Sequence, residues 1–164
     1  MPRYTVVVRR ATKRDASRIL ELVNQWYAED GEKPIERLSS RIMKACFGRT
    51  KVDHLLVAVD DDGVVGYAYV HPMYDIGIEE PHLMLEDLYV TKPKRSRGVG
   101  NKLMSAVARL AKQEGAIGVV WVVHKFNRRG IKFYASQGAE KSEYDTLYLK
   151  GRALSSKARS VATI

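Results

Sequence analysis

The chain has 164 residues, of which 45% are hydrophobic and 29% charged, and this composition suits one globular domain with a sizeable core rather than two domains. The N-terminus lacks the apolar segment of a secretory signal, and no apolar run reaches the roughly 18 residues that cross a bilayer, so we expect a soluble protein of the cytoplasm. The formal net charge of +9 indicates attraction to anions, whether nucleic acid, acidic membrane or a phosphorylated cofactor, and does not distinguish between them.

Hydrophobic periodicity predicts that the chain starts with the order β-α-α. Residues 4–9 are β-branched and form a short run, as in a strand, and residues 12–30 carry apolar side chains at helical spacing. Gly31 and Pro34 interrupt this pattern, and a second helix is predicted around Cys46. Because Cys46 is the single cysteine, no internal disulfide can form, and its spacing favours the buried face of the helix over a role as a nucleophile.

Seven further elements follow. In chain order they are a hairpin of strands 54–60 and 64–73, a strand at 82–90, a helix at 102–115, a strand at 116–123 apolar enough to be buried on both faces, a short helix at 127–138 and a closing strand at 144–151. The complete order, β-α-α-β-β-β-α-β-α-β, predicts an α/β (α+β) fold whose helices flank a mixed, mostly antiparallel sheet. We expect residues 1–150 to form one domain and residues 151–164 to be a basic, flexible tail.

A basic loop connects the strand at 82–90 to the helix that follows it. Residues 92–102, KPKRSRGVGNK, contain five bases and two glycines. Backbone N–H groups at a helix N-terminus have no intrahelical partner and bind phosphate where side chains leave room, as Gly98 and Gly100 do, while Arg95 and Arg97 add charge-assisted contacts. The Gly-Lys-Ser/Thr of a Walker loop and the third glycine of the dinucleotide fingerprint are both missing. We therefore predict a phosphate-binding loop, and a solvated, Lys/Arg-rich turn is the alternative.

The motif RSRGVG resembles the Arg/Gln-x-x-Gly-x-Gly/Ala loop of the GNAT family of N-acetyltransferases. The element order matches that family over about residues 4–150, and the segments LMLEDLYV and IKFYASQGA are most similar to the spermidine/spermine (diamine) acetyltransferase branch. One departure is Ser96, where many members of this branch have glycine. The resemblance implies a GNAT fold, acetyl-coenzyme A (acetyl-CoA) as co-substrate, and a homodimer.

The resemblance also implies which residues bind the cofactor. Leu88, Tyr89 and Val90 match the strand whose backbone pairs with the pantetheine arm and offers an N–H group to the thioester carbonyl. The remaining positions that match cofactor contacts are Arg95, Ser96, Arg97, Gly98, Val99, Gly100 and Asn101 in the pyrophosphate loop, and Asn127, Arg129 and Gly130 after it.

Two catalytic residues follow from the same resemblance. Tyr134 matches the tyrosine proposed to protonate the departing thiolate, and Glu86 matches a carboxylate that faces the amine, as does Asp87. The chemistry requires such groups, because a protonated amine must lose a proton before it attacks and a thiolate leaves more readily beside a hydroxyl donor. Adjacent strand residues face opposite sides of a sheet, so we expect at most one of the two carboxylates to point directly into the site. Tyr134 could instead be an ordinary core residue.

The acceptor site is predicted from charge as well. Residues 71–90 carry five acids and no Lys or Arg, whereas residues 92–102 carry five bases and no acid. A cationic acceptor would therefore bind over the first segment and the anionic cofactor over the second. The resemblance implies that Glu86 and Asp87 face the amine and that Glu29 and Asp30, at the end of the first predicted helix, help to hold it. Trp121 is also assigned to the acceptor, although its apolar setting suits the core.

These features together predict an N-acetyltransferase that acts on a primary amine of a small cationic acceptor, such as a polyamine, a diamine or a lysine-like amino acid, by direct attack in a ternary complex. A protein lysine or N-terminal acetyltransferase is the first alternative. A basic nucleic-acid-binding module is a remote one, because the basic run lacks interleaved aromatic residues for stacking on bases. We expect no metal, because His71, His82 and His124 lack the spacing of metal ligands, and no membrane partner.

Overall fold

The computed structural model describes residues 5–159, except for the side chains of Ile78 and Arg159. The chain divides after Arg128 into two compact units, and each unit is described by itself. The predicted first strand residue, Tyr4, and the end of the predicted tail, residues 160–164, lie outside the described part. None of the helices within residues 5–159 is long and apolar enough to cross a membrane.

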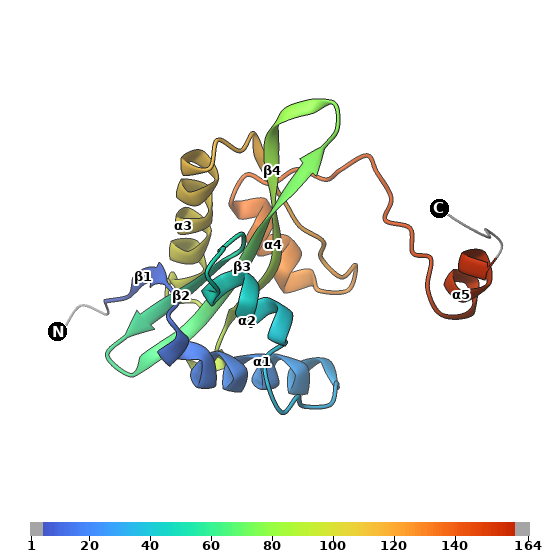
Figure 1. The fold of residues 1–164 in the computed structure, drawn as a ribbon. Helices are drawn as coiled ribbons and strands as arrows, with labels where there is room; N and C mark the ends of the chain where they lie inside the picture. The colour runs from blue at the N-terminus through green and yellow to red at the C-terminus, as the bar shows by residue number, and fades with distance from the viewer. Residues whose placement is uncertain (1–4, 160–164) are drawn as a thin grey trace. The chain divides into compact units, whose positions relative to one another are not determined.

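The first unit is built on a five-stranded sheet with the strand order β1-β2-β3-β4-β5 (Figure 1). The first four strands form an antiparallel meander, and the last one runs parallel to β4. Their bounds are Val7–Arg10 for β1, His54–Asp60 for β2, Gly63–Asp75 for β3, Ile78–Val90 for β4 and Gly118–Val120 for β5. The predicted hairpin turn is confirmed, with Gly63 at a φ of 99° that suits glycine.

Helices cover both faces of this sheet. Helices α1 (Ala16–Asp30) and α2 (Ser40–Phe47) pack on a core cluster that includes Leu55, Val57 and Tyr67. The alternate residues point the other way, toward α3 (Val99–Gln113), and a Cβ added to Gly66 would lie 3.4 Å from Leu103 of that helix. This arrangement confirms the predicted mixed α/β class.

The Asp15 carboxylate organises the backbone before α1. A short 3-10 turn, Lys13–Asp15, precedes the helix, and the Thr12 backbone N–H donates to the Asp15 carboxylate at 2.7 Å. Arg9 adds two hydrogen bonds to the same carboxylate, at 2.8 and 2.9 Å. Because the charged form accepts all these bonds, the pKa of Asp15 lies well below its usual range.

The strand predicted at 116–123 is much shorter in the structure. Only Gly118–Val120 pair with β4, and Val122 beyond them is 62% exposed, so the prediction of a long strand buried on both faces is wrong. No strand among residues 5–159 pairs with the second edge of β5, which leaves the segment without the neighbour that would bury it. As a result, residues 85–90 of β4 pair with β3 alone.

The second unit consists of two helices and an extended segment. Helix α4 (Arg128–Ser136) is followed by a turn in which Gly138 has a φ of 82°, and helix α5 (Gly151–Arg159) lies within the predicted tail. The closing strand predicted at 144–151 does not form. Tyr144 and Leu147 are each 90% exposed, because within this unit no strand accepts the segment's backbone hydrogen bonds. The domain boundary predicted at residue 150 stays a prediction.

Candidate active site

The loop that precedes α3 has the backbone geometry of an anion site. Gly98 has a φ of 81° and lies at the N-cap position of α3, and the first N–H groups of the helix have no intrahelical acceptor. A Cβ built on Gly98 would meet no atom within 4 Å, so the left-handed backbone, rather than crowding by the protein, accounts for glycine there. Ser96 is also left-handed, with a φ of 60°. Glycine, which the sequence analysis noted at this position in similar proteins, is therefore the residue that this backbone conformation favours.

Arg95 connects this loop to α1. Its Nε donates to the Val90 carbonyl at 2.6 Å, its Nη2 donates to Glu29 at 2.7 Å, and its guanidinium lies 5.1 Å from the centre of the Tyr89 ring. The Tyr89 hydroxyl donates to the same Glu29 oxygen at 2.7 Å. Burial opposes the charge on Glu29, but these two hydrogen bonds outweigh it, so the pKa of Glu29 lies below its ordinary value. The structure thus joins an acid assigned to the acceptor with a base assigned to the cofactor.

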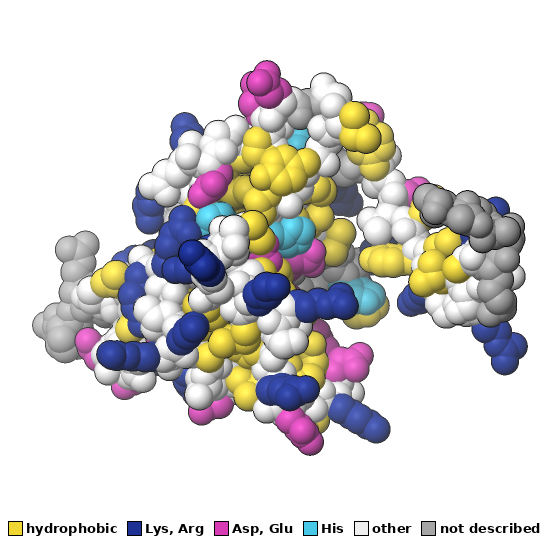
Figure 2. All heavy atoms as spheres, in the orientation of Figure 1, with side chains coloured by type: hydrophobic (Ala, Val, Ile, Leu, Met, Phe, Trp, Pro, Cys, Tyr) yellow, Lys and Arg dark blue, Asp and Glu magenta, His cyan; other side chains and the backbone are white. Residues whose placement is uncertain are grey.

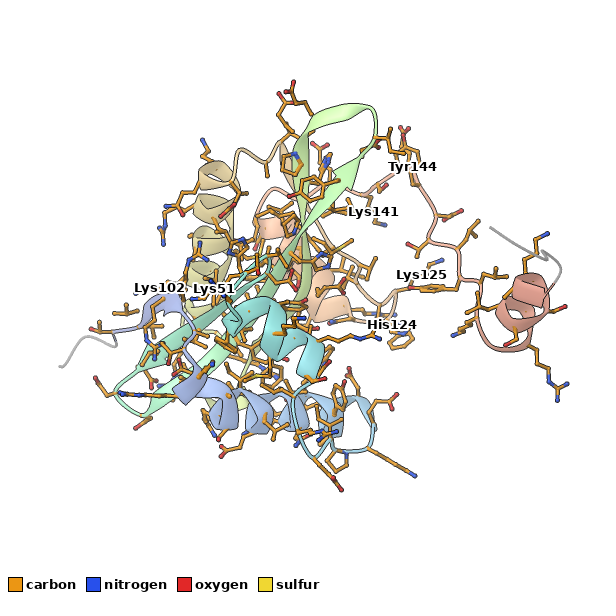
Figure 3. The ribbon with its side chains drawn as sticks, viewed as in Figure 1. Lys51, Lys102, His124, Lys125, Lys141 and Tyr144 are labelled. Atoms are coloured by element: carbon orange, nitrogen blue, oxygen red, sulfur yellow. The ribbon has the colours of Figure 1, made fainter. Side chains whose placement is uncertain are left out.

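Other bases of the loop also have protein partners. Lys94 forms ion pairs with Asp60 at 2.6 Å and Asp62 at 2.5 Å in the β2–β3 turn. Lys102 donates to the Val6 carbonyl at 2.7 Å, and Figure 3 shows this side chain at the start of α3. Arg97 is exposed on the loop. The number of bases in the sequence therefore overstates the charge available to a ligand.

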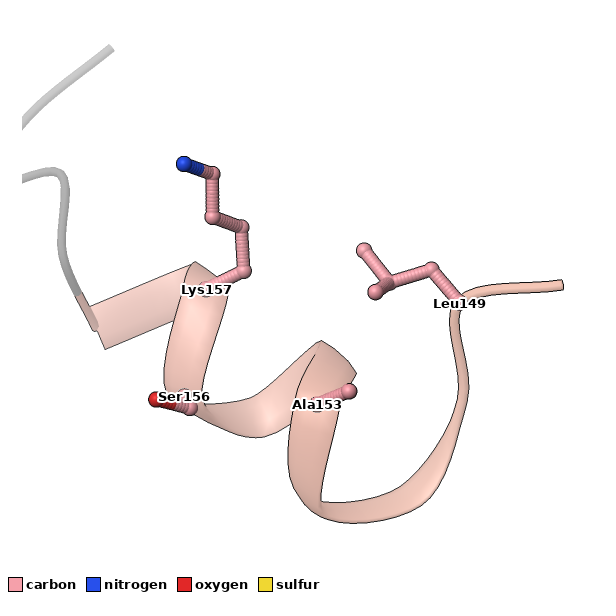
Figure 4. Close-up of a pocket in the computed structure, with 4 residues that line it drawn as sticks. All are labelled: Leu149, Ala153, Ser156 and Lys157. Carbon is pink, nitrogen blue, oxygen red and sulfur yellow. The ribbon is translucent and has the colours of Figure 1, made fainter.

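A pocket of about 410 Å³ adjoins the end of β4. Its lining comes from α1, β4 and the 3-10 turn η2 (Lys92–Lys94), namely Gln25, Ala28, Glu29, Tyr89, Thr91, Lys92 and Pro93. This volume lies within the range of small-molecule sites. A second pocket, beside α5 in the other unit, is lined by Leu149, Ala153, Ser156 and Lys157 (Figure 4) and includes none of the predicted site residues.

A β-bulge brings the two candidate carboxylates to one face of the sheet. Tyr69 pairs with Asp87 and Val70 pairs with Leu85, so Glu86 is the extra residue of the bulge. Asp87 lies opposite Tyr69, and Glu86 reaches His71 on the same face of β3 with an Oε1–Nε2 distance of 2.9 Å. The expectation that these neighbours face opposite sides is therefore wrong, because the bulge breaks the strict alternation of side chains.

The environments of these two carboxylates differ. Glu86 is exposed, whereas Asp87 is half-buried, and burial followed by the nearby charge of Glu86 raises the pKa of Asp87 to about 6. Burial lowers the pKa of His71, but the hydrogen bonds to Glu86 and the Pro72 carbonyl and the nearby acidic charges together outweigh it, so the net shift is upward. Tyr69 donates to Asp53 at 2.5 Å beside this pair. Sequence reasoning missed Tyr67, Tyr69, His71 and Asp53, because their proximity depends on strand register.

The remaining predicted site residues are distributed over both units. Trp121 is half-buried and Asn127 exposed in the loop after β5, where His124 stacks on Phe126 with ring centres 3.6 Å apart; Figure 3 labels His124 and its neighbour Lys125. Asp30 is the exposed last residue of α1. Arg129, Gly130 and Tyr134 lie on α4 in the second unit, so their roles beside the loop and the carboxylates stay predictions.

Charge is unevenly distributed over the first unit. Lys and Arg side chains gather over α1 and α2 in Figure 2, whereas the tip of the β3–β4 hairpin presents acidic and apolar groups. The exposed residues of that tip include Tyr74, Asp75, Ile76, Glu79 and Glu80. Within residues 5–159, no group of three or more His, Cys, Asp or Glu side chains is placed to hold a metal ion.

Comparison with known proteins shows what this chain is similar to. Residues 20–139 match the family described as "Acetyltransferase (GNAT) family". The thialysine N-epsilon-acetyltransferase of Bos taurus is 28% identical over 144 residues, which cover 82% of this chain and 84% of that protein. The spermidine/spermine N(1)-acetyltransferase-like protein 1 of Homo sapiens is 26% identical over 140 residues, which cover 80% of this chain and 20% of that protein.

A solved structure shares the fold. The ribosomal-protein-alanine N-acetyltransferase of Brucella melitensis biovar Abortus 2308 superposes with a TM-score of 0.75, over 90% of this chain and all of that chain. Because the two sequences are 17% identical, this likeness concerns the fold alone. It confirms the expected GNAT arrangement of helices around an open sheet.

Proposed function

Since the chain belongs to the GNAT family and is an N-acetyltransferase, we propose that it transfers the acetyl group of acetyl-CoA to a primary amine of a small cationic acceptor. The observation that carries this proposal is the bulge in β4, which places Glu86 and Asp87 on one face in a chain of net charge +9. Two carboxylates together attract a polyamine, a diamine or a lysine-like amino acid. They also offer a group that can take the amine's proton.

The residues of the first unit fit the cofactor. The N–H groups at the start of α3 suit a pyrophosphate, because Gly98 turns the chain there and no helical acceptor occupies them. The backbone of Leu88, Tyr89 and Val90 has a second side that no strand within residues 5–159 pairs with, and an extended pantetheine arm with amide groups matches such an edge. Acetyl-CoA supplies the activated acetyl thioester.

The protein's part in the reaction is to orient the two substrates and to move protons. A carboxylate on β4 takes a proton from the ammonium, and the free amine attacks the thioester carbon in a ternary complex. Tyr134, on α4, would protonate the departing thiolate. A backbone N–H group of Leu88, Tyr89 or Val90 would stabilise the negative charge that develops on the carbonyl oxygen.

The relatives support a small acceptor. Their names specify thialysine and spermidine or spermine, all of which carry amines that are cationic at neutral pH. The basic surface over α1 and α2 opposes a free polycation at long range, but screening beyond about 8 Å leaves the local carboxylates as the stronger influence. The homodimer and the cytoplasmic location stay predictions.

The deciding experiment is a turnover screen with acetyl-CoA against amines, amino acids and peptides, in which release of the coenzyme A thiol is measured. We expect turnover of diamines, polyamines or lysine analogues to exceed that of peptides with the same amine. Preference for peptides would favour the protein acetyltransferase alternative. A lack of turnover with every amine, together with salt-sensitive DNA binding and no binding of coenzyme A, would contradict the proposal.

A further inference from the structure

His71, on β3, contacts a hydrogen-bond acceptor with each of its two ring nitrogens. Nδ1 lies 3.2 Å from the carbonyl oxygen of Pro72, and Nε2 lies 2.9 Å from Oε1 of Glu86 on β4. Because a carbonyl oxygen can only accept a hydrogen bond, Nδ1 carries a proton in both the charged and the neutral form of the ring. The nitrogen that gains or loses a proton is therefore Nε2, which faces the carboxylate.

The contact between these two side chains differs between the two forms of the ring. In the imidazolium, Nε2–H donates to the Glu86 carboxylate and the two charges compensate each other. In the neutral ring, the lone pair of Nε2 faces the lone pairs of an ionised carboxylate, so the hydrogen bond is lost and the negative charge is left without a partner. The Glu86 side chain is 47% exposed, so a cation from solution can reach this carboxylate.

We propose that His71 is a positioning residue that competes with the acceptor for Glu86: the imidazolium holds the carboxylate, and the neutral ring leaves it to an ammonium group of the acceptor. The inference rests on the proposed function and deepens it by making acceptor binding depend on the protonation of one histidine. When the acceptor binds, the N–H bond at Nε2 breaks and its proton goes to water. An ammonium N–H group then donates to Glu86 in its place.

The other titratable groups around the imidazole are acids and neutral side chains. The charges that act on the ring are those of Glu86 and of Asp53, before β2, and the Tyr69 ring on β3 has its centre 5.9 Å away. Asp87 adjoins Glu86, and Cys46 of α2 adjoins Asp53 as a neutral thiol, because burial raises its pKa to about 11. Burial lowers the pKa of the imidazole, but its hydrogen bonds and these acids outweigh burial and raise it. The positive charge is therefore present near neutral pH and is lost as the pH rises through the folded value.

Competition for one carboxylate has two reciprocal consequences. Loss of the proton from His71 must strengthen acceptor binding, and acceptor binding must lower the pKa of His71. Because an ion pair that is partly exposed contributes little, we expect the affinity for the acceptor to differ by about two- to fivefold between the two forms of the ring.

The test uses 1,4-diaminobutane, a diamine of the proposed acceptor class, and the full chain saturated with coenzyme A. In calorimetric titrations, the affinity for the diamine should rise about two- to fivefold between about pH 7 and about pH 8.5. Asp87, with a pKa of about 6, is already ionised in this range. His71→Gln, which is uncharged, should bind the diamine tightly throughout the range, and His71→Lys, which is cationic, should bind it weakly throughout. The matched control is His82→Gln, on β4 opposite Met73, which should keep the pH dependence.

A second measurement requires no acceptor. Nitrogen-15 NMR of the imidazole rings, with His71→Gln to identify the resonances, gives the tautomer and the pKa of His71. We expect the neutral ring to carry its proton on Nδ1, which donates to the Pro72 carbonyl. The pKa of His71 should fall in Glu86→Gln, because the carboxylate no longer stabilises the imidazolium. Saturating 1,4-diaminobutane should lower this pKa in the unaltered protein as well.

The possible results separate this inference from the proposed function. An unchanged pKa of His71 in Glu86→Gln would overturn the pairing on which the inference depends. Turnover of amines, together with a diamine affinity whose pH dependence is the same in the unaltered protein and in His71→Gln, would overturn the competition and leave the acetyltransferase proposal standing. Equally weak binding by His71→Gln and His71→Lys would also overturn it, because a purely structural role predicts that result. A lack of turnover with every amine would contradict the proposed function itself, and the NMR titration would still decide whether His71 and Glu86 pair.

Discussion

Ser96 has a φ of 60°, the one positive value among the described residues other than glycine. A side chain in this left-handed region costs about 1–2 kcal/mol, whereas glycine there costs about 0.5–1 kcal/mol of unfolded-chain entropy. We therefore expect Ser96→Gly to raise the free energy of unfolding slightly, by about 0.5 kcal/mol. Ser105→Gly, at an exposed position inside α3, is the matched control and should lower it by about the same amount. Urea denaturation measures the free energy of unfolding of both variants. If Ser96→Gly lowered it as much as Ser105→Gly does, the backbone at Ser96 would be unstrained.

Asp87 is expected to oppose folding at neutral pH. Because its folded pKa of about 6 exceeds the unfolded value, the folded state binds the proton more tightly than the unfolded state does. Proton binding by Asp87 therefore stabilises the folded state fully below the unfolded pKa, and this stabilisation is lost as the pH rises through 6. Asp87→Asn should therefore raise the free energy of unfolding at pH 7.5 by about 1–2 kcal/mol. At pH 5.0, where folded Asp87 is mostly protonated, the difference in the free energy of unfolding between Asp87→Asn and the unaltered protein should be about 1 kcal/mol smaller.

The control for this prediction is Asp61→Asn in the exposed turn between β2 and β3. This substitution removes the same charge from a basic protein, but at a carboxyl group that is exposed rather than buried. Denaturant titrations of both variants at the two pH values decide the matter. If Asp87→Asn and Asp61→Asn changed stability equally at pH 7.5, net charge rather than burial of Asp87 would be the cause.

For single residues, the sequence indicates their chemical role better than it indicates which other residues they contact. Residues for phosphate binding and proton transfer could be proposed from RSRGVG and LED. The sequence did not predict that Arg95 would contact Glu29 and Tyr89 rather than point freely at an anion. Glu29 and Arg95 lie 66 positions apart, and their contact depends on how α1 packs against the end of β4. Such pairings follow from tertiary packing, which local patterns do not specify.

Elements were predictable where local signals determine them. The helix at 102–115 and the hairpin through Gly63 depend on periodicity and turn chemistry, and both form. The bulge at Glu86 was not predictable, because it is a mismatch in register between two strands. The closing strand at 144–151 was predicted from β propensity alone, and a strand also requires a neighbour with free backbone groups.

The N-terminus of α3 allows a test of the predicted pyrophosphate seat. Gly98 and Gly115 lie at opposite ends of this helix, both left-handed, and a Cβ on either would meet no atom within 4 Å. Gly98→Ala and Gly115→Ala should therefore lose similar amounts of unfolding free energy, about 1–2 kcal/mol each. Only Gly98→Ala should weaken coenzyme A binding, by about tenfold, because it disturbs N–H groups that would hold the phosphates. Calorimetric titration with coenzyme A measures this, and equal affinities would place the pyrophosphate elsewhere.

Across the whole chain, the excess positive charge and the local acids suit the two proposed substrates, which carry opposite charges. A net charge of +9 would draw an anionic cofactor toward the protein, while the carboxylates at the β4 bulge would attract a cationic acceptor at close range. Within the basic loop, Lys94 is neutralised by Asp60 and Asp62, and Arg95 by Glu29. The anion-binding capacity of the loop therefore depends more on oriented backbone N–H groups than the composition suggests.

The predicted reaction also depends on a residue of the second unit. Tyr134, on α4, would protonate the coenzyme A thiolate as the C–S bond breaks, so Tyr134→Phe should lower kcat by about 10–100-fold. Its KM for acetyl-CoA should stay within about twofold, because the hydroxyl acts on the leaving group rather than on binding. Tyr144→Phe, in the exposed segment of the same unit, is the control and should change neither constant. Steady-state kinetics with the best acceptor decides between these roles. A raised KM at unchanged kcat would make Tyr134 a binding residue. A change in kcat no larger than that of Tyr144→Phe would mean that solvent protonates the thiolate.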